Sequence, residues 1–304
     1  MSTENTEPSR SEYWYDDGSV VLVVENTAFR VHKSILSQHS DVFADLFTIP
    51  EPPHKELDFM DGCSVVHLQD DLKDFTEVIK AIYQPFYFDA LPQDADLRKL
   101  LGFISGILKI STKYNLARLR QKCIDILRDK FPTTLYGCDD LVSSGYQYNA
   151  TTVVSAIPLA RETNVPEILP WAFYISTNIE TDTLLADPVL SWRDKALCLA
   201  GKSQLWERQK NDTHKFLFDF VNAPDCRHGC SLRLQQMTWK HMEELRKRPH
   251  PLHEYDNWDS LGVCASCLQR AQDQHARGRE KVWNDLPKIF HLGTWNEIRE
   301  EQNR

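Results

Sequence analysis

The chain has 304 residues, of which 41% are hydrophobic, and a formal net charge of −9. This length allows two or three domains with cores of their own. No apolar run reaches about 18 residues, so we predict no membrane span. Residues 226–304 hold thirteen Lys and Arg against eleven Asp and Glu, a charge of +2, which leaves −11 on residues 1–225. Because phosphate backbones bind clustered cations, this balance disfavours a nucleic-acid partner.

The N-terminal residues are polar and acidic and lack the cationic-then-apolar layout of a signal peptide. We therefore expect residues 1–12 to be a disordered tail and the protein to stay in the cytoplasm, the nucleus or both. Thiols remain reduced there, so close pairs among the eight cysteines favour a metal over a disulfide.

Residues 17–47 predict two strands followed by two short helices. Val20–Val24 is a β-branched run that suits a buried strand, and a polar turn follows in which Asn26 can adopt the left-handed backbone. Ala28–Val31 alternates as a second strand. The period then becomes helical, and Ser40 is the predicted N-cap of the second helix.

Further elements follow in the same region. A third strand is predicted over Val65–Leu68, and Asp70 or Asp71 is expected to cap an amphipathic helix that ends near Tyr83. Apolar stripes over 97–108 and 116–127 predict two more helices.

This order of elements resembles the BTB/POZ domain, in particular its expanded fungal branch. Seven positions match the family in register: Phe29, His32, Lys33, Leu36, Ser40, Phe43 and Phe47. The resemblance implies an α+β fold over residues 13–131, in which a small mixed sheet is capped by helices. It also implies a protein-binding platform without chemistry of its own. The aromatic, proline-containing connection 84–96 is longer than in most relatives.

The resemblance implies two kinds of partner besides an unknown protein client. One is a second copy of the chain, bound through the first helix and the adjoining N-terminal segment; the same residues would also suit core packing. The candidate contacts are Tyr13, Trp14, Val20, Leu22, Ile35, Leu36 and Phe43. The other is a cullin scaffold, for which family adaptors use an apolar-x-Glu triplet, here Ile49-Pro50-Glu51 with an atypical proline and a short spacing.

Residues 132–222 predict an all-α region whose helices are punctuated by prolines. The aromatic stripe Trp171–Tyr174 is interpreted as core packing, with a ligand groove as the alternative. Residues 223–304 are polar and weakly periodic. The closing helix from Cys267 to Leu286 contains few apolar residues.

Two close cysteine pairs make residues 223–304 a predicted zinc-binding region: Cys226, Cys230, Cys264 and Cys267. Four thiolates can surround zinc tetrahedrally, and such a closed site stabilises a fold without catalysing a reaction. Gly229 and Gly262 suit the turns beside the pairs. Two alternatives stay open. The cysteines could simply pack in a core, or a histidine could replace one sulfur; the candidates are His228, His241, His250 and His253.

We find no catalytic motif. Gly201-Lys-Ser203 is similar to the end of a phosphate loop, but the upstream glycine that such a loop needs is missing. The sequence therefore predicts a non-enzymatic interaction protein, and the resemblance implies that it is a self-associating substrate adaptor of a cullin-type ubiquitin ligase. One alternative is a nuclear transcription regulator whose cysteine pairs form a nucleic-acid-binding finger. Another is a plain scaffold protein.

Overall fold

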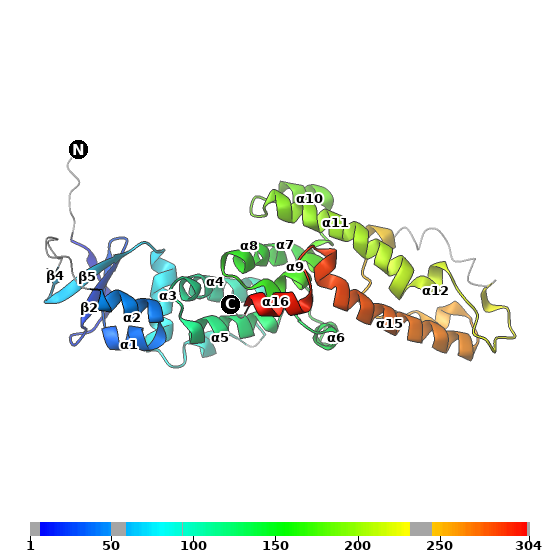
Figure 1. Ribbon diagram of the computed structural model, residues 1–304, viewed down its shortest axis with the longest axis horizontal. Coiled ribbons are helices and arrows are strands. Elements are labelled where there is room, and N and C mark those ends of the chain that lie inside the picture. The colour runs from blue at the N-terminus through cyan, green and yellow to red at the C-terminus, as the bar shows by residue number, and fades with distance from the viewer. Residues whose placement is uncertain (1–6, 50–58, 93, 232–244, 303–304) are drawn as a thin grey trace. The chain divides into compact units, whose positions relative to one another are not determined.

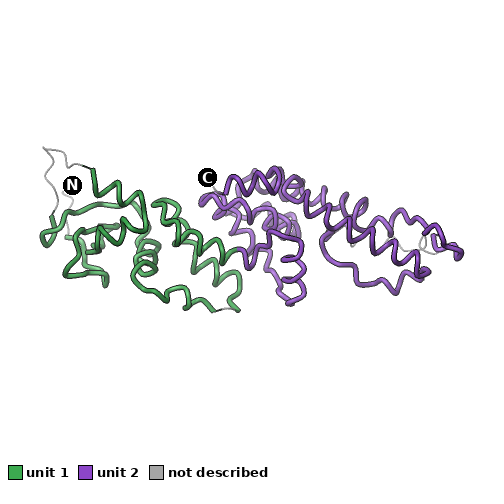
Figure 2. Tube along the Cα trace, turned by 60° about the horizontal axis from the view of Figure 1, so that its bottom comes forward, with its two compact units in different colours: residues 1–127 green, residues 128–304 purple. Residues whose placement is uncertain are grey.

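The computed structural model describes residues 7–49, 59–92, 94–231 and 245–302. The chain divides into two compact units, residues 1–127 and residues 128–304 (Figure 2). Unit 1 contains the predicted mixed sheet with its helices, and unit 2 is helical throughout its described part. Unit 2 thus contains both the predicted helical region, residues 132–222, and the predicted zinc-binding region, residues 223–304.

Unit 1 is built on a five-stranded mixed sheet in the order β1-β3-β2-β5-β4 (Figure 1). Strand β2 lies at its centre, antiparallel to β3 and parallel to β5. All five residues of β2 are buried, which confirms the prediction of a strand covered on both faces. The strands are β1 (Ser9–Trp14), β2 (Val20–Val24), β3 (Thr27–Val31), β4 (Phe59–Met60) and β5 (Cys63–Leu68).

The turn between β2 and β3 differs from its prediction in one residue. The left-handed backbone belongs to Glu25, with φ 52°, and not to Asn26. A non-glycine residue in this conformation needs support from its surroundings. The Glu25 carboxylate supplies it by accepting a hydrogen bond of 3.2 Å from the backbone N–H of Leu72 at the start of α3.

Strand β1 runs through residues that we had expected to be disordered, because residues 9–12 belong to it. It pairs in parallel with β3, and Ser9 donates its N–H to the carbonyl of Asn26 at 2.9 Å. The side chain of Tyr13 is buried at its end. Four polar residues precede that tyrosine, so the strand has no alternating pattern that would reveal it.

Two helices of unit 1, α2 and α3, begin at the predicted caps. The Ser40 hydroxyl accepts the N–H of Phe43 at 3.0 Å, and Asp71 accepts the N–H of Asp74 at 2.9 Å. Such caps satisfy N–H groups that have no partner inside the helix. The helices are α1 (Lys33–His39), α2 (Asp41–Thr48), α3 (Leu72–Tyr83), the 3₁₀-helix η1 (Tyr87–Ala90), α4 (Leu97–Lys113) and α5 (Ala117–Arg128).

Unit 2 is organised around α9 (Leu169–Ser176), in which all eight residues are buried. The aromatic stripe Trp171–Tyr174 is therefore core, as interpreted from the sequence. The other helices before the cysteine region are α6 (Leu135–Ser143), α7 (Ala150–Val154), α8 (Ala156–Glu162), η2 (Pro166–Ile168), α10 (Thr181–Ala186), α11 (Trp192–Arg208), the π-helix η3 (Gln209–Thr213) and α12 (Lys215–Phe218).

The remaining described elements are η4 (Trp258–Leu261), α15 (Ala265–Ile289) and α16 (Trp295–Gln302). Helix α15 packs against α9, α11, η3 and α12 (Figure 1). It therefore joins the cysteine region to the rest of unit 2. Among the described residues, no helix is long and apolar enough to span a membrane.

Candidate metal centre and binding surfaces

The first cysteine pair is shaped by a turn after α12. Cys226 donates its N–H to the Ala223 carbonyl at 3.0 Å, and Gly229 takes a left-handed φ of 61° before Cys230. A residue with a Cβ adopts that φ at a cost, so glycine suits the bend that returns Cys230 toward Cys226.

The second pair is placed by the start of α15. Gly262 is left-handed, with φ 60°, Cys264 is the N-cap residue, and Cys267 lies in the first helical turn. The predicted roles of the two glycines as turn residues are confirmed. The Ser266 hydroxyl also donates to the Asp225 carboxylate at 2.6 Å, which ties the two turns together.

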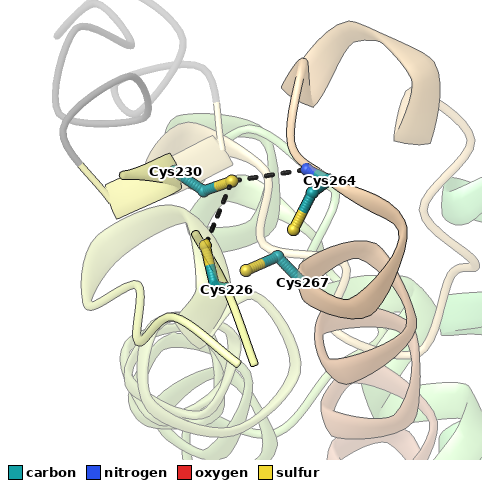
Figure 3. Close-up of side chains that lie close together, drawn as sticks. All are labelled: Cys226, Cys230, Cys264 and Cys267. Carbon is teal, nitrogen blue, oxygen red and sulfur yellow. Dashed lines mark hydrogen bonds between the residues drawn. The ribbon is translucent and has the colours of Figure 1, made fainter. Parts of the chain in front are cut away.

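The four sulfur atoms lie within 4.8 Å of one another, and Figure 3 shows them converging from the two turns. Sulfur atoms at the zinc–thiolate distance of about 2.3 Å form a tetrahedron with edges of about 3.8 Å. The sulfurs of Cys226 and Cys230 are 3.7 Å apart, close to that edge and far from the ~2.05 Å of a disulfide. The donor set therefore fits a tetrahedral thiolate-binding metal.

Backbone N–H groups point at these sulfurs. Cys264 donates to Cys230 at 3.3 Å, and Ala223 donates to Cys267 at 3.2 Å. The N–H groups of Cys230 and His228 lower the pKa of Cys226 to about 6. Burial raises the pKa of Cys267 to about 12. A bound divalent cation favours all four thiolates, and the N–H donors then share their charge.

The described histidines do not join the cluster, which consists of the four cysteines alone. His228 is exposed, and His250 and His253 lie instead beside each other, with ring centroids 5.4 Å apart. His241 lies outside the described residues. The four remaining cysteines are buried away from the cluster: Cys63, Cys123, Cys138 and Cys198.

Two residues of α15, His275 and Arg279, hold the loop that leads into the second pair, and the sequence did not single them out. His275 accepts the N–H of Tyr255 through Nε2 at 3.2 Å and donates through Nδ1 to the Thr213 carbonyl at 2.8 Å. The roles are unambiguous, because a backbone N–H only donates and a carbonyl only accepts. His275 is therefore a neutral imidazole with one tautomer.

Arg279, one turn further on, is buried and donates to the Leu252 carbonyl at 2.8 Å and to the Glu254 carboxylate at 3.2 Å. It also forms an ion pair with Asp139 of α6. Between these two residues, Gly278 allows α15 to touch η3, since a Cβ at this position would lie 2.5 Å from the Asp212 carbonyl oxygen. Lone His, Gly and Arg residues give no motif by which sequence reasoning could have found them.

The structure divides the predicted interface residues of unit 1 into two groups. Tyr13, Val20, Leu22, Leu36 and Phe43 are buried in the core of the single chain, so they offer no surface to a partner. Core packing, the alternative stated for them, explains these five positions.

Trp14 and Ile35 are partly exposed, and Ile49 is 64% exposed at the C-terminal end of α2. The Arg10 guanidinium covers the Trp14 ring at 4.5 Å from its centroid. Pro50 and Glu51, the rest of the predicted cullin triplet, lie outside the described residues. Among the residues that the structure describes, the accessible part of the predicted interface is therefore Trp14, Ile35 and Ile49.

The segment that is similar to a phosphate loop has no such role in the structure. Gly201-Lys-Ser203 lies in the middle of α11, and a Cβ on Gly201 would meet the Phe290 ring at 2.1 Å. This glycine therefore serves helix packing.

Comparison with family models matches residues 16–130 to the BTB/POZ domain. This part of the chain is a BTB/POZ domain. The match agrees with the observed sheet and helices and ends at the junction with unit 2. BTB/POZ domains are protein-interaction modules that commonly self-associate and bind cullins. No curated protein matches the chain.

We expect acid to destabilise unit 2 through His275. Burial lowers the pKa of His275 below its ordinary value of 6.5, and the Arg279 charge lowers it further, against the opposing effects of the Thr213 carbonyl and the Glu254 carboxylate. The unfolded chain therefore binds this proton more readily. The stability is full above about pH 6.5 and falls as the pH drops, by at most about 1.4 kcal/mol per pH unit for one histidine.

Denaturant unfolding between pH 7.5 and 5 measures this dependence in the native chain and in His275→Gln. The variant should be less stable at pH 7.5 and less sensitive to acid. His67→Gln, an exposed histidine of β5, is the matched control and should behave as the native chain does. Equal acid sensitivity of His275→Gln and the native protein would contradict the assignment.

Proposed function

We propose that this protein is a self-associating BTB/POZ adaptor that links a cullin-type ubiquitin ligase to a protein client, in the cytoplasm or the nucleus. The observation that carries the proposal is the BTB/POZ domain itself, with Trp14, Ile35 and Ile49 accessible on it. Unit 2 then serves the client. Within it we retain the separation of a helical region, residues 132–222, from a metal-binding region, residues 223–304.

We further propose that the four-cysteine cluster holds one structural zinc ion. Cys226, Cys230, Cys264 and Cys267 would be its ligands, and four thiolates leave no position for a reacting water. The metal would fasten the two ends of the connection between residues 230 and 264. Structural zinc contributes roughly 10 kcal/mol or more to such small regions.

Ion pairs of α15 argue against the alternative of a nucleic-acid finger. Three of the five cations of this helix are paired with carboxylates of the same unit: Arg279, Lys281 and Lys288. A finger helix instead directs its cations to a groove and to phosphates. The adaptor role is thus better supported.

Zinc binding predicts one equivalent of metal per chain, which elemental analysis of the purified protein measures. Chelation should open residues 223–290 to limited proteolysis and leave the BTB/POZ fragment intact. Cys267→Ser should lose the metal, whereas Cys138→Ser, which changes another buried cysteine of unit 2, should keep it. A metal-free native chain, or digestion that chelator leaves unchanged, counts against the site.

Self-association predicts a dimer at micromolar concentration, measured by size-exclusion chromatography with light scattering. Trp14→Glu should shift the species to monomer, because it places a charge in the accessible part of the predicted interface. Trp192→Glu changes a tryptophan of unit 2 that is 73% exposed and should leave the dimer intact. A strictly monomeric native chain removes this part of the proposal.

Cullin recruitment predicts co-purification with a cullin scaffold, lost in the double variant Ile49→Ala/Glu51→Ala. Val42→Ala, on the same helix and 40% exposed, is the control for general damage to α2. Recovery of the cullin with the double variant at native yield would sink the adaptor role while leaving self-association standing.

A further inference from the structure

A pocket of about 470 Å³ lies in unit 2, among the end of α6, the segment that leads to α7, and α9. Trp171 and Ile175 line it from α9, and Tyr146 and Tyr148 line it from the connecting segment. The α9 residues are buried, whereas the two tyrosines are partly exposed. The pocket therefore has an aromatic wall that solvent reaches at Tyr146 and Tyr148, with buried Trp171 behind them.

Three aromatic rings follow one another along this wall. Tyr146 and Tyr148 meet edge to face with centroids 4.9 Å apart, and Tyr148 meets Trp171 at 6.0 Å. Lys130 holds the first ring, with its ammonium 4.4 Å from the Tyr146 centroid. The backbone carbonyl of Lys130 also accepts a hydrogen bond from the Tyr148 hydroxyl. The rings are thus ordered before any ligand arrives, which reduces the entropy cost of binding.

The lining contains no Asp, Glu, Lys or Arg. Its one histidine, His253, has a pKa lowered first by burial and then by His250 and Arg279, so it is neutral at neutral pH. The side-chain amides of Gln147 and Asn178 also line the pocket, and both residues are exposed. A ligand must therefore be uncharged where it touches the pocket and able to use amide donors.

We propose that this pocket binds a proline-rich segment of a partner protein in the polyproline II conformation. Such a segment has no internal hydrogen bonds, so its carbonyl oxygens are free to accept from Gln147 and Asn178. Its pyrrolidine rings are neutral and can stack on the partly exposed rings of Tyr146 and Tyr148, and its backbone is already extended before binding. The pocket would thus give unit 2 a ligand of its own, separate from the partners that bind the BTB/POZ domain.

Other ligand classes fit less well. An acidic or basic peptide would bury its charge against a lining that offers no counter-charge. A flexible apolar peptide would lose more conformational entropy than a proline-rich one and would need a partner for each of its N–H groups.

Fluorescence anisotropy of labelled ten-residue peptides tests the proposal on the full chain. We expect saturable binding of a proline-rich peptide and none of a glycine–serine or a leucine–serine peptide of the same length. Tyr146→Ala should weaken binding by about tenfold, since a stacked ring contributes about 1.4 kcal/mol. Tyr146→Phe keeps the ring and should retain most of the affinity.

Two further variants separate binding from folding. Val142→Arg places a cation at the pocket edge, where Val142 is 49% exposed, and should abolish binding without removing core packing. Tyr136→Ala removes a tyrosine of the same helix that is 81% exposed and does not line the pocket, so affinity should be unchanged. Absence of binding to the native chain, equal binding of the leucine–serine peptide, or full affinity in Val142→Arg would each overturn the proposal. These outcomes are independent of dimerisation and of cullin binding.

Discussion

Unit 2 depends on how closely α15 approaches the π-helix η3. At Gly278 the two backbones are so near that a single methyl group would collide with the Asp212 carbonyl. Contacts on either side of the glycine use this spacing, because His275 reaches the Thr213 carbonyl and Lys281 reaches the Asp212 carboxylate at 2.7 Å. A π-helix is a rare element that often marks a functional or strained site. Here it brings backbone carbonyls within reach of α15.

The same helix links the cysteine cluster to the buried core. Its inward stripe is entirely buried and has helical spacing: Cys267, Ala271, His275, Gly278, Val282 and Leu286. The first four bury little apolar area, and burial yields only about 25 cal/mol per Å². The end of α15 that carries Cys264 and Cys267 therefore has the smaller hydrophobic contribution. A metal bound there would add to the small hydrophobic contribution of this end of the helix.

The sequence predicts those parts of the structure that depend on local patterns, and it does not predict those that depend on contacts between distant segments. In unit 1, β2 is a run of apolar residues and the caps Ser40 and Asp71 are local, so pattern and position agree. Strand β1 has no alternation of apolar and polar residues that would reveal it. The left-handed backbone of Glu25 is supported by its contact with Leu72, which is distant in the sequence. For the cluster, spacing predicts each cysteine pair, but the fold must bring the pairs together across the connection. His275, Gly278 and Arg279 act through backbone groups of other segments, which no local pattern encodes.

The net charge of the chain affects charged partners and an uncharged proline-rich partner differently. The chain is acidic overall, with its excess of carboxylates in residues 1–225, so its long-range field repels acidic partners and attracts basic ones. A proline-rich segment without charges experiences little of this field, and its association should be slower and nearly independent of salt. The ordered rings of Tyr146 and Tyr148 then determine selectivity through short-range contacts. A partner could thus be selected by unit 2 without competing electrostatically with the proteins that the BTB/POZ domain binds.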